Sequence, residues 1–390
     1  MKSLRIALCA GEASGDLLAA DLVRALRERF PDAEFAGIAG PKMRAAGVTS
    51  WWDASELSVM GLAEVLRHLP RLLRLRRDFR QRVLDWTPDV FIGIDAPDFN
   101  LGVEKWLKAR GVRTVHDVSP SIWAWREARA EKIGESADRV LCLFPMEPPI
   151  YAMHGVDARF IGHPLADALP LDPDRDAARR ELAIMGDGPV LALLPGSRMG
   201  EIARMLPTFL ETADRVGKQI ANLEVLIPAA DEHCRHAIES LLRQIPLAHA
   251  YARVLDGHAQ QAMIASDAVL LASGTAALEA MLAKRPMVIG HRISPATYRI
   301  VKLFGLLKSR FVSLPNVLAG RELVPECLQD DCTPERLADE LLRWLRDPSA
   351  FATVEPEFLR IHEELRRDAS SQAALAIADL IAQGEPLPAP

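Results

Sequence analysis

Short apolar runs alternate along this chain with longer segments in which apolar residues recur at helical spacing. This alternation predicts βα units built around parallel sheets, an α/β fold. We expect strands at residues 4–9, 34–38, 90–94, 113–118 and 139–144 in the first half, and at 190–194, 223–227, 252–255, 268–272 and 287–290 in the second. The last part of the chain, at 334–347 and 351–381, has helical spacing and no strand signal.

The segment at residues 162–187 carries Pro164, Pro170, Pro173 and several charges, which predicts a crossing between two domains. We therefore expect two doubly wound domains, at 1–165 and 166–346, followed by C-terminal helices at 347–383 and a disordered tail at 384–390. In such sheets ligands bind beyond the carboxyl ends of the strands, in the crevice between units.

Composition narrows the class of protein. The chain has 390 residues, ordinary globular composition and a net charge of −6, so no global basic field points to a nucleic-acid partner. Its five cysteines include no C-x-x-C pair, which argues against a disulfide framework and for a cytosolic protein. No run of about 18 apolar residues predicts a membrane span. The apolar N-terminus holds Arg5 and is expected to be a buried strand rather than a signal sequence.

A turn rich in small residues, at 11–16, follows the first expected strand. Gly11, Glu12, Ser14 and Gly15 would let backbone N–H groups approach a ligand at a helix N-terminus. The spacing is not G-x-G-x-x-G, which argues against a nicotinamide cofactor. The alternative is a tight turn in which Ser14 or Asp16 caps the helix.

Two carboxylates follow the apolar strand at 90–94. Asp95 is a candidate base that would accept a proton from a hydroxyl nucleophile. The alternative is an Asx turn at Asp95, with Asp98 capping the next helix. We favour catalysis, because a carboxylate at a buried strand end is costly to desolvate without a role.

Residues 119–126 supply Ser119, two indoles including Trp123, and Arg126 after another expected strand. Aromatic faces stack on sugars or acyl chains. The alternative, two core tryptophans after a turn, is equally compatible with the spacing.

Two strand–loop–helix junctions in the second half offer the groups that a diphosphate needs: hydroxyls, free N–H groups and a guanidinium. They comprise Gly196, Ser197, Arg198, Ser273, Gly274 and Thr275, with Glu279 one helical turn later in reach of ribose hydroxyls. Ordinary helix capping by Ser197 and Ser273 is the alternative. Two such junctions in one half favour nucleotide binding.

The segment at residues 62–82 predicts an arginine-rich amphipathic helix, and a helix of this kind can lie on a membrane surface, although the pattern alone favours the more common alternative that follows. The alternative is a core helix with a solvated basic face, and Pro70 predicts a break or kink. The apolar stripe contains Leu62, Val65, Leu66, Leu69, Leu72 and Leu73, and the opposite face contains Arg67, Arg71 and Arg74.

Two groups of residues resemble metal sites. Asp172 and Asp174 form an Asp-x-Asp pattern, but they precede Ala177 in a polar segment where helix capping explains them. His233, Cys234 and His236 crowd three ligand types into one turn with no distant partner. We expect both groups to be surface features, and we expect no metal.

The ordered motifs together resemble one family. They lie at residues 10–16, 93–100, 118–126, 194–198, 272–279 and 313–320. In this order the chain resembles the lipid-A-disaccharide synthases, from about residue 4 to 381. It departs from the family pattern at Asp117, where an aromatic commonly precedes the Ser-Pro-Ser motif, and at His291, where a Tyr commonly precedes Arg292.

The resemblance implies an inverting, metal-independent GT-B glycosyltransferase with two Rossmann-like domains and no cofactor. It implies transfer from UDP-2,3-diacylglucosamine to 2,3-diacylglucosamine 1-phosphate, giving a β-1′,6-linked disaccharide 1-phosphate and UDP. Asp95 would be the base, Arg198 and the helix start at Ser273 would stabilise the departing UDP, and Glu279 and Asn316 would hold the nucleotide. Because both substrates carry acyl chains and lie in a membrane, the resemblance favours the interpretation of residues 62–82 as a helix on a membrane surface.

The expected partners are the two lipid substrates, anionic membrane lipids and a second copy of the chain in a homodimer. The expected location is the cytoplasm, at the inner membrane surface. Two alternatives remain open: another UDP-sugar enzyme, such as a different GT-B transferase or a UDP-N-acetylglucosamine epimerase, and a catalytically silent nucleotide-sugar or lipid-binding module.

Overall fold

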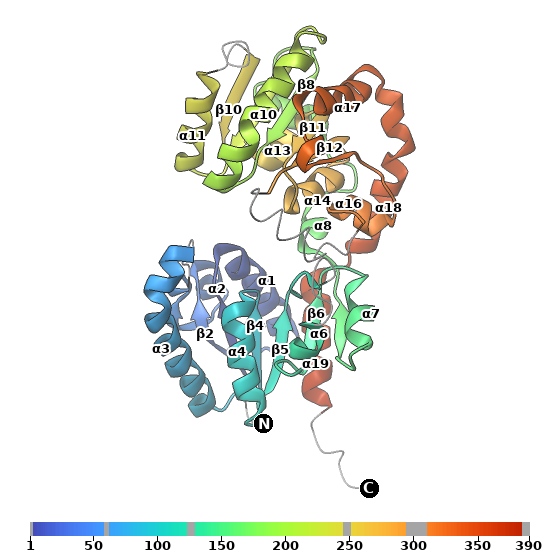
Figure 1. Ribbon diagram of the computed structural model, residues 1–390. Helices are drawn as coiled ribbons and strands as arrows, with labels where there is room; N and C mark the ends of the chain where they lie inside the picture. The colour runs from blue at the N-terminus through green and yellow to red at the C-terminus, as the bar shows by residue number, and fades with distance from the viewer. Residues whose placement is uncertain (1–2, 58–61, 123–128, 245–250, 294–309, 384–390) are drawn as a thin grey trace. The chain divides into compact units, whose positions relative to one another are not determined.

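The computed structural model describes residues 3–57, 62–122, 129–244, 251–293 and 310–383. The chain forms two compact units (Figure 1). Unit 1 comprises Met1–Asp167 and Leu365–Pro390, and unit 2 comprises Ala168–Glu364. The chain thus enters unit 2 close to the expected boundary, but it returns to unit 1 for its last helix.

The sheet of unit 1 is parallel, with the strand order β3-β2-β1-β4-β5-β6-β7. Its strands are β1 (Arg5–Ala10), β2 (Glu34–Ala39), β3 (Thr49–Asp53), β4 (Val90–Ile94), β5 (Arg113–Asp117), β6 (Arg139–Cys142) and β7 (Ala158–Phe160). The central strands β1 and β4 are almost completely buried, as continuous apolar runs in a sheet covered on both faces should be.

Helices cover both faces of this sheet. They are α1 (Ala13–Arg29), α2 (Pro41–Ala45), η1 (Ala54–Glu56), α3 (Leu62–Trp86), α4 (Pro97–Lys108), α6 (Arg129–Gly134), α7 (Glu147–Ala152), α8 (Pro164–Ala168) and α19 (Ala369–Ala382). One core packs α1 and α19 against the strands, and a second packs α3 and α4. Arg139, fully buried on β6, ties α19 to the sheet through the Ala376 carbonyl and the Asp379 carboxylate.

Unit 2 also contains a parallel sheet, with the strand order β10-β9-β8-β11-β12-β13. Its strands are β8 (Val190–Leu194), β9 (Glu224–Ala229), β10 (Ala252–Asp256), β11 (Ala268–Leu271), β12 (Met287–His291) and β13 (Glu326–Leu328). Its helices are α9 (Arg175–Glu181), α10 (Met199–Gly217), α11 (Glu232–Leu242), α13 (Ala259–Ala265), α14 (Thr275–Leu282), α16 (Leu314–Ala319), η2 (Gln329–Asp331), α17 (Pro334–Arg346), η3 (Pro348–Thr353) and α18 (Glu355–Leu365).

The strands expected from the sequence are confirmed to within about two residues at either end. The pattern missed β3, β7 and β13, which are short strands at sheet edges. An edge strand is buried on fewer sides, so its sequence need not be continuously apolar.

The chain crosses between the units at Asp167 and Ala168, inside the segment expected at 162–187, which also contains α8 and α9. Two expectations about the helices need correction. The C-terminal helices do not form one region, because α18 belongs almost wholly to unit 2 and α19 to unit 1. Helix α3 runs through Pro70 without the expected break. The tail at 384–390 lies outside the described residues. Within the described ranges no helix has the length and apolar character of a membrane span.

Candidate active site

Asp95 lies in a tight loop between β4 and α4. Its φ of 50° and the φ of 43° at Ala96 place two successive non-glycine residues in the left-handed region, a conformation that costs free energy and clusters at functional sites. The backbone N–H of Asp95 donates to the carbonyl of Asp117 on β5, at 2.9 Å. The capping alternative is wrong: Ala96 is the N-cap of α4, and no side chain bonds there.

Asn100 holds this loop in place from the first turns of α4. Its side chain is fully buried, and its Nδ2 donates to the carbonyl oxygens of Cys9, Ile94 and Asp95 at 3.2, 3.3 and 2.9 Å. One amide thus links the ends of β1 and β4 to the strained loop. The sequence analysis did not single out this residue, although it stands within the motif at 93–100.

A pocket of about 410 Å³ opens beside Asp95 in unit 1. It is lined by Gly11, Glu12, Leu57, Leu69, Leu72, Leu73, Arg76, Asp95, Ala96, Pro97, Asp98 and Phe99. The pocket brings together two expected acceptor residues, the expected base and three leucines of the α3 stripe. A Cβ at Gly11 would lie 3.2 Å from the Cβ of Ala96, so a small residue there lets the two loops pack closely.

The other small residues of the first loop lie differently. Ser14 is exposed on α1, and Gly15 is buried against Ala10 and Ile94. The capping alternative is wrong here too, because Glu12 is the N-cap of α1 and its side chain makes no capping bond. The carboxylate of Asp16 instead accepts the N–H groups of Lys42 and Met43 and so caps α2.

Ser119 is buried after β5. Its hydroxyl lies 3.0 Å from the hydroxyl of Tyr151 and donates to the carbonyl of Pro120 at 3.1 Å. The Ser119 hydroxyl therefore makes these contacts to other parts of the protein. Trp123 and Arg126, the other expected acceptor residues of this loop, lie outside the described residues.

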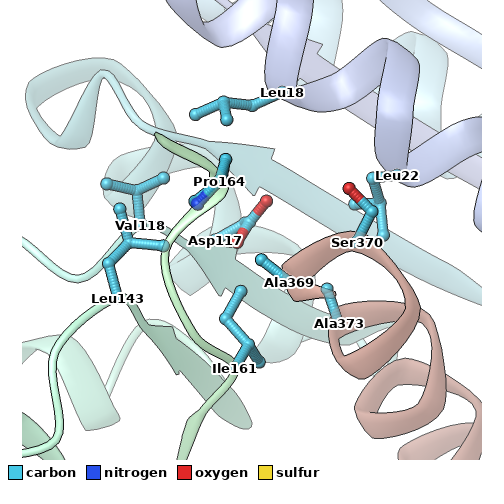
Figure 2. A pocket seen from close by; sticks show the side chains of 10 residues that line it. All are labelled: Leu18, Leu22, Asp117, Val118, Leu143, Ile161, Pro164, Ala369, Ser370 and Ala373. Atoms are coloured by element: carbon cyan, nitrogen blue, oxygen red, sulfur yellow. The ribbon is translucent and has the colours of Figure 1, made fainter. Parts of the chain in front are cut away.

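Asp117 lies at the end of β5, on the sheet face that α1 and α19 cover. Figure 2 shows it in a small cavity of about 20 Å³, among Leu18, Leu143 and Ile161, with Ser370 of α19 nearby. Burial raises the pKa of Asp117 to about 6, against the opposing attraction of His116. One of its carboxylate oxygens has no hydrogen-bond partner within the described part of the chain.

In unit 2, the loop after β8 presents Arg198. Gly196 has a φ of 121°, which a side chain rarely adopts, and Arg198 is the N-cap of α10 with no side-chain capping bond. The Arg198 side chain is 81% exposed and lies 3.3 Å from the Glu201 carboxylate. Ser197 donates its N–H to Glu201 rather than capping the helix, so the capping alternative is wrong at this junction. The guanidinium is therefore accessible to a ligand.

The loop after β11 forms the second junction. Ser273 and Gly274 have φ values of 96° and 92°, and Gly274 is the N-cap of α14 with no side-chain bond. Ser273 therefore does not cap the helix, and Thr275 begins it with an exposed side chain. Glu279 is half-buried one turn later, and burial raises its pKa.

Asn316 takes a different place from the one expected of a nucleotide contact. It is fully buried at the start of α16. Its Nδ2 donates to the Val324 carbonyl and the Glu326 carboxylate, and its Oδ1 accepts from the N–H groups of Leu323 and Val324. The amide is thus fully engaged in ordering the loop before β13.

The suspected metal-binding groups have structural roles. Asp174 caps α9 by accepting the N–H of Ala177 at 2.8 Å. Cys234 is buried, contrary to the surface position expected, with its thiol against the carbonyl of Ser197. In the described ranges no three potential metal ligands lie together.

The sequence as a whole matches known proteins over nearly its full length. Residues 6–378 match the family model described as lipid-A-disaccharide synthetase. The chain belongs to this family. A lipid-A-disaccharide synthase of Xanthomonas campestris pv. campestris (strain 8004) is 61% identical over 385 residues, which are 99% of this chain and 88% of that protein. Another, from Xylella fastidiosa (strain M12), is 56% identical over 97% of this chain and 98% of that protein.

Membership of the lipid-A-disaccharide synthetase family confirms the resemblance seen in the ordered motifs and, with it, an enzyme of glycosyl transfer in lipid A biosynthesis. Solved structures show the fold. The calicheamicin glycosyltransferase CalG4 superposes with a TM-score of 0.59 at 14% identity, covering 99% of this chain and 100% of that one. A UDP-GlcNAc 2-epimerase from Neisseria meningitidis gives 0.58 at 11% identity, covering 98% and 100%. The two parallel-sheet α/β domains are those of the GT-B class.

Proposed function

We propose that this chain joins UDP-2,3-diacylglucosamine to 2,3-diacylglucosamine 1-phosphate, forming the β-1′,6-linked disaccharide 1-phosphate and UDP. The observation that carries the proposal is the pocket in unit 1, which is lined both by Asp95 and Glu12 and by the leucines of α3. A sugar with attached acyl chains needs this combination of a base, polar contacts and apolar surface.

The acceptor is the substrate that fits this pocket. Asp95 takes the proton of the acceptor 6-hydroxyl as that oxygen attacks the donor sugar. Leu69, Leu72 and Leu73 supply apolar surface for an acyl chain, and Arg76 supplies a cation in the same pocket. Gly11 and Glu12 line the same pocket and belong to the proposed acceptor region. Ser14, Gly15, Ser119, Trp123 and Arg126 are proposed acceptor residues on the sequence motifs alone.

The donor's nucleotide binds to unit 2. Gly196, Ser197 and Arg198 face the diphosphate together with the uncapped start of α14 at Ser273, Gly274 and Thr275. Negative charge that develops on the departing UDP is stabilised by the Arg198 guanidinium and by backbone N–H groups, without a metal ion or a cofactor. Glu279 hydrogen-bonds the ribose hydroxyls. Asn316 supports the site by ordering the loop before β13.

The enzyme works at a membrane surface as a cytoplasmic, peripherally bound homodimer. Leu69 and Leu73 are 41% and 46% exposed, and Arg71 and Arg74 are exposed on the same helix. The proposed membrane-facing residues also include Leu62, Val65 and Leu66 of the stripe and Arg67 of the opposite face, as expected from the sequence. An apolar stripe beside cations suits an anionic bilayer, where each nearby arginine adds about 1 kcal/mol to binding.

A direct assay tests the proposal. Purified protein is incubated with both diacyl substrates, and mass spectrometry follows the disaccharide 1-phosphate and UDP. Asp95→Asn keeps the shape of the side chain and removes its basicity, so we expect turnover to fall ~10²-fold or more while calorimetry still detects UDP binding. Near-normal turnover in this variant would remove Asp95 from the base role.

The same assay separates the alternatives. An epimerase would convert UDP-N-acetylglucosamine and leave the two lipids unjoined. A silent binding module would bind UDP-sugar or lipid and release no UDP.

A further inference from the structure

A cavity of about 260 Å³ lies at the amino ends of three neighbouring strands of unit 2. Its lining includes Pro189 just before β8, Asp267 just before β11 and Pro286 just before β12. The loops proposed to bind the nucleotide follow the carboxyl ends of β8 and β11. A strand of five residues, as β8 is, separates the two edges of the sheet by about 16 Å. The cavity is therefore separate from the nucleotide loops.

Two arginines that line this cavity keep N–H groups without an acceptor. Arg175 of α9 pairs with the Asp267 carboxylate through its Nη2, and its buried Nε has no partner in the described part of the chain. Arg285 donates its Nε and Nη1 to the carbonyl oxygens of Ile264 and Lys284, at 2.9 and 3.0 Å. Among the described residues none accepts from its Nη2. The cavity thus offers donors from two guanidinium groups.

The carboxylate beside these donors is shared. Asp267 accepts from Arg179 Nη2 at 2.8 Å as well as from Arg175, and also from a backbone N–H at 2.7 Å. Two other acids nearby, Asp187 and Glu355, are exposed, so water screens their charge. The cavity therefore has an excess of positive charge.

The ionisation of Arg285 reflects this excess. Burial, and then repulsion from Arg175, lowers the pKa of Arg285 to about 10, with attraction to Asp267 opposing. The guanidinium stays protonated at neutral pH, but its surroundings disfavour the charge. An anion between the two arginines would relieve their repulsion and accept the unused N–H groups.

Aromatic side chains line the same cavity. Trp344 of α17 and Phe351 of η3 lie with their ring centroids 6.5 Å apart. Trp344 is buried, and its Nε1 has no hydrogen-bond partner within the residues that the structure describes. Apolar surroundings strengthen a hydrogen bond between a guanidinium and an anion, because they exclude water. They also give a carbon group attached to the anion a surface on which to pack.

We propose that this cavity is a ligand site of unit 2, which binds a phosphate group, free or on a small molecule, between the guanidinium groups of Arg175 and Arg285. A phosphate monoester carries about −1.5 to −2 charge at pH 7 and three acceptor oxygens, which matches two cations with unused donors. The bound ligand stabilises unit 2, because it binds the folded chain and not the unfolded one. The inference does not rest on the proposed sugar transfer.

NMR of the tryptophan indole N–H groups reads the occupancy of the site. The chain has 7 tryptophans, and Trp344→Phe identifies the signal of interest. Phenyl phosphate should move the Trp344 signal in a saturable way, with a dissociation constant in the millimolar range or below. Benzoate, which replaces the phosphate by a carboxylate, should bind at least about tenfold more weakly. Sodium chloride at equal ionic strength should leave the signal in place.

An inorganic phosphate titration distinguishes the two sources of the group. Binding as tight as that of phenyl phosphate would identify free phosphate as the ligand. Weaker but saturable binding would identify a phosphate ester, whose carbon group adds contacts with the aromatic side chains.

Substitutions locate the binding. Arg285→Met keeps an unbranched side chain and removes the charge, so it should weaken phenyl phosphate binding at least about tenfold. Arg175→Met should do the same, and it decides if Arg285→Met fails to fold, because Arg179 still pairs with Asp267. Arg215→Met is the matched control, since Arg215 is an exposed arginine of unit 2 on α10. It should leave the affinity unchanged.

Arg198→Met excludes a response from the nucleotide loops. Phosphate bound at Arg198 lies at the other edge of the sheet, so this variant should show the same Trp344 shift as the wild type.

Three results would overturn the site. They are the absence of a saturable Trp344 shift up to about 50 mM of either phosphate probe, equal affinity for benzoate, and unchanged affinity in folded Arg285→Met or Arg175→Met. The arginines would then serve only to hold α9 against the sheet. Because no sugar or lipid enters this titration, its outcome leaves the proposed transfer reaction to its own assay.

Discussion

At the residue scale, Asn100 is a side chain that holds the Asp95 loop in place. It satisfies three carbonyl oxygens around a loop with two left-handed residues. Asn100→Ala should lower the free energy of unfolding by roughly 1–3 kcal/mol, because buried carbonyls lose their donor. Turnover should fall further than stability explains, since Asp95 loses its position.

Urea unfolding and kcat at a temperature where the variant is fully folded measure these two effects. A folded Asn100→Ala protein with unchanged kcat would contradict the positioning role.

Asp117 predicts a pH dependence of stability. Burial raises its pKa from 3.8 to about 6, so the folded state retains a proton that the unfolded chain releases between about pH 4 and 6. Stability from this group is therefore present at low pH and lost as pH rises through that window. Asp117→Asn is always neutral and should be more stable than the wild type by roughly 1–3 kcal/mol at pH 7.5, with little difference at pH 4.

Urea unfolding of both proteins at the two pH values checks this expectation. An equal stability difference at both pH values would show that the Asp117 charge is not responsible.

At the scale of elements, helix α3 has a buried part and an exposed part. Its C-terminal half is anchored by Phe79, whose ring lies 6.0 Å from Phe91 and 5.9 Å from Trp52. Its earlier turns leave Leu69 and Leu73 exposed beside the pocket. The later turns of α3 therefore pack in the core, and the earlier turns, with Leu69 and Leu73, are accessible to a ligand or a membrane.

Leu69→Ser with Leu73→Ser tests the surface role of α3. The wild type should sediment with anionic vesicles at low salt and less so at high salt, because the arginine contribution is screened. The double variant should stay in the supernatant with a melting temperature close to that of the wild type. Leu375→Ser is the control, since Leu375 is 41% exposed on α19, away from this stripe. Wild-type protein that ignores such vesicles would disprove docking.

At the scale of the whole molecule, the C-terminal helix completes the N-terminal unit. Ile377 of α19 is fully buried in the core with β1 and β4, whereas Leu375 on the same helix is exposed. Ile377→Ala should lower the free energy of unfolding by about 2–5 kcal/mol, because it removes core methyl groups and leaves a cavity. Leu375→Ala should have little effect. Equal effects of the two substitutions, measured by urea unfolding, would mean that α19 contributes little to the unit 1 core.

The sequence by itself determined the two α/β units, the central strands and the family. These follow from local signals: strands buried on both faces must be continuously apolar, and loops that bind ligands need small residues and fixed charges near strand ends. The sequence pattern did not predict the edge strands β3, β7 and β13, because a partly buried strand need not be continuously apolar. The assignments of Asp95 and of the UDP loops remain predictions that the experiments above address.

Only the tertiary structure decided which residues meet. Glu104 and His116 lie 12 positions apart on a helix and a strand, and Arg139 reaches Asp379 240 positions later. Asn316 is polar, as a ligand contact would be, but its side-chain amide makes its hydrogen bonds to the backbone of its own loop. A side chain's partners depend on how strands are ordered and how helices cross them, and periodicity along the chain carries no information about that order. For this reason the contact between Glu104 and His116 could be found only from the arrangement of β5 and α4 in the structure.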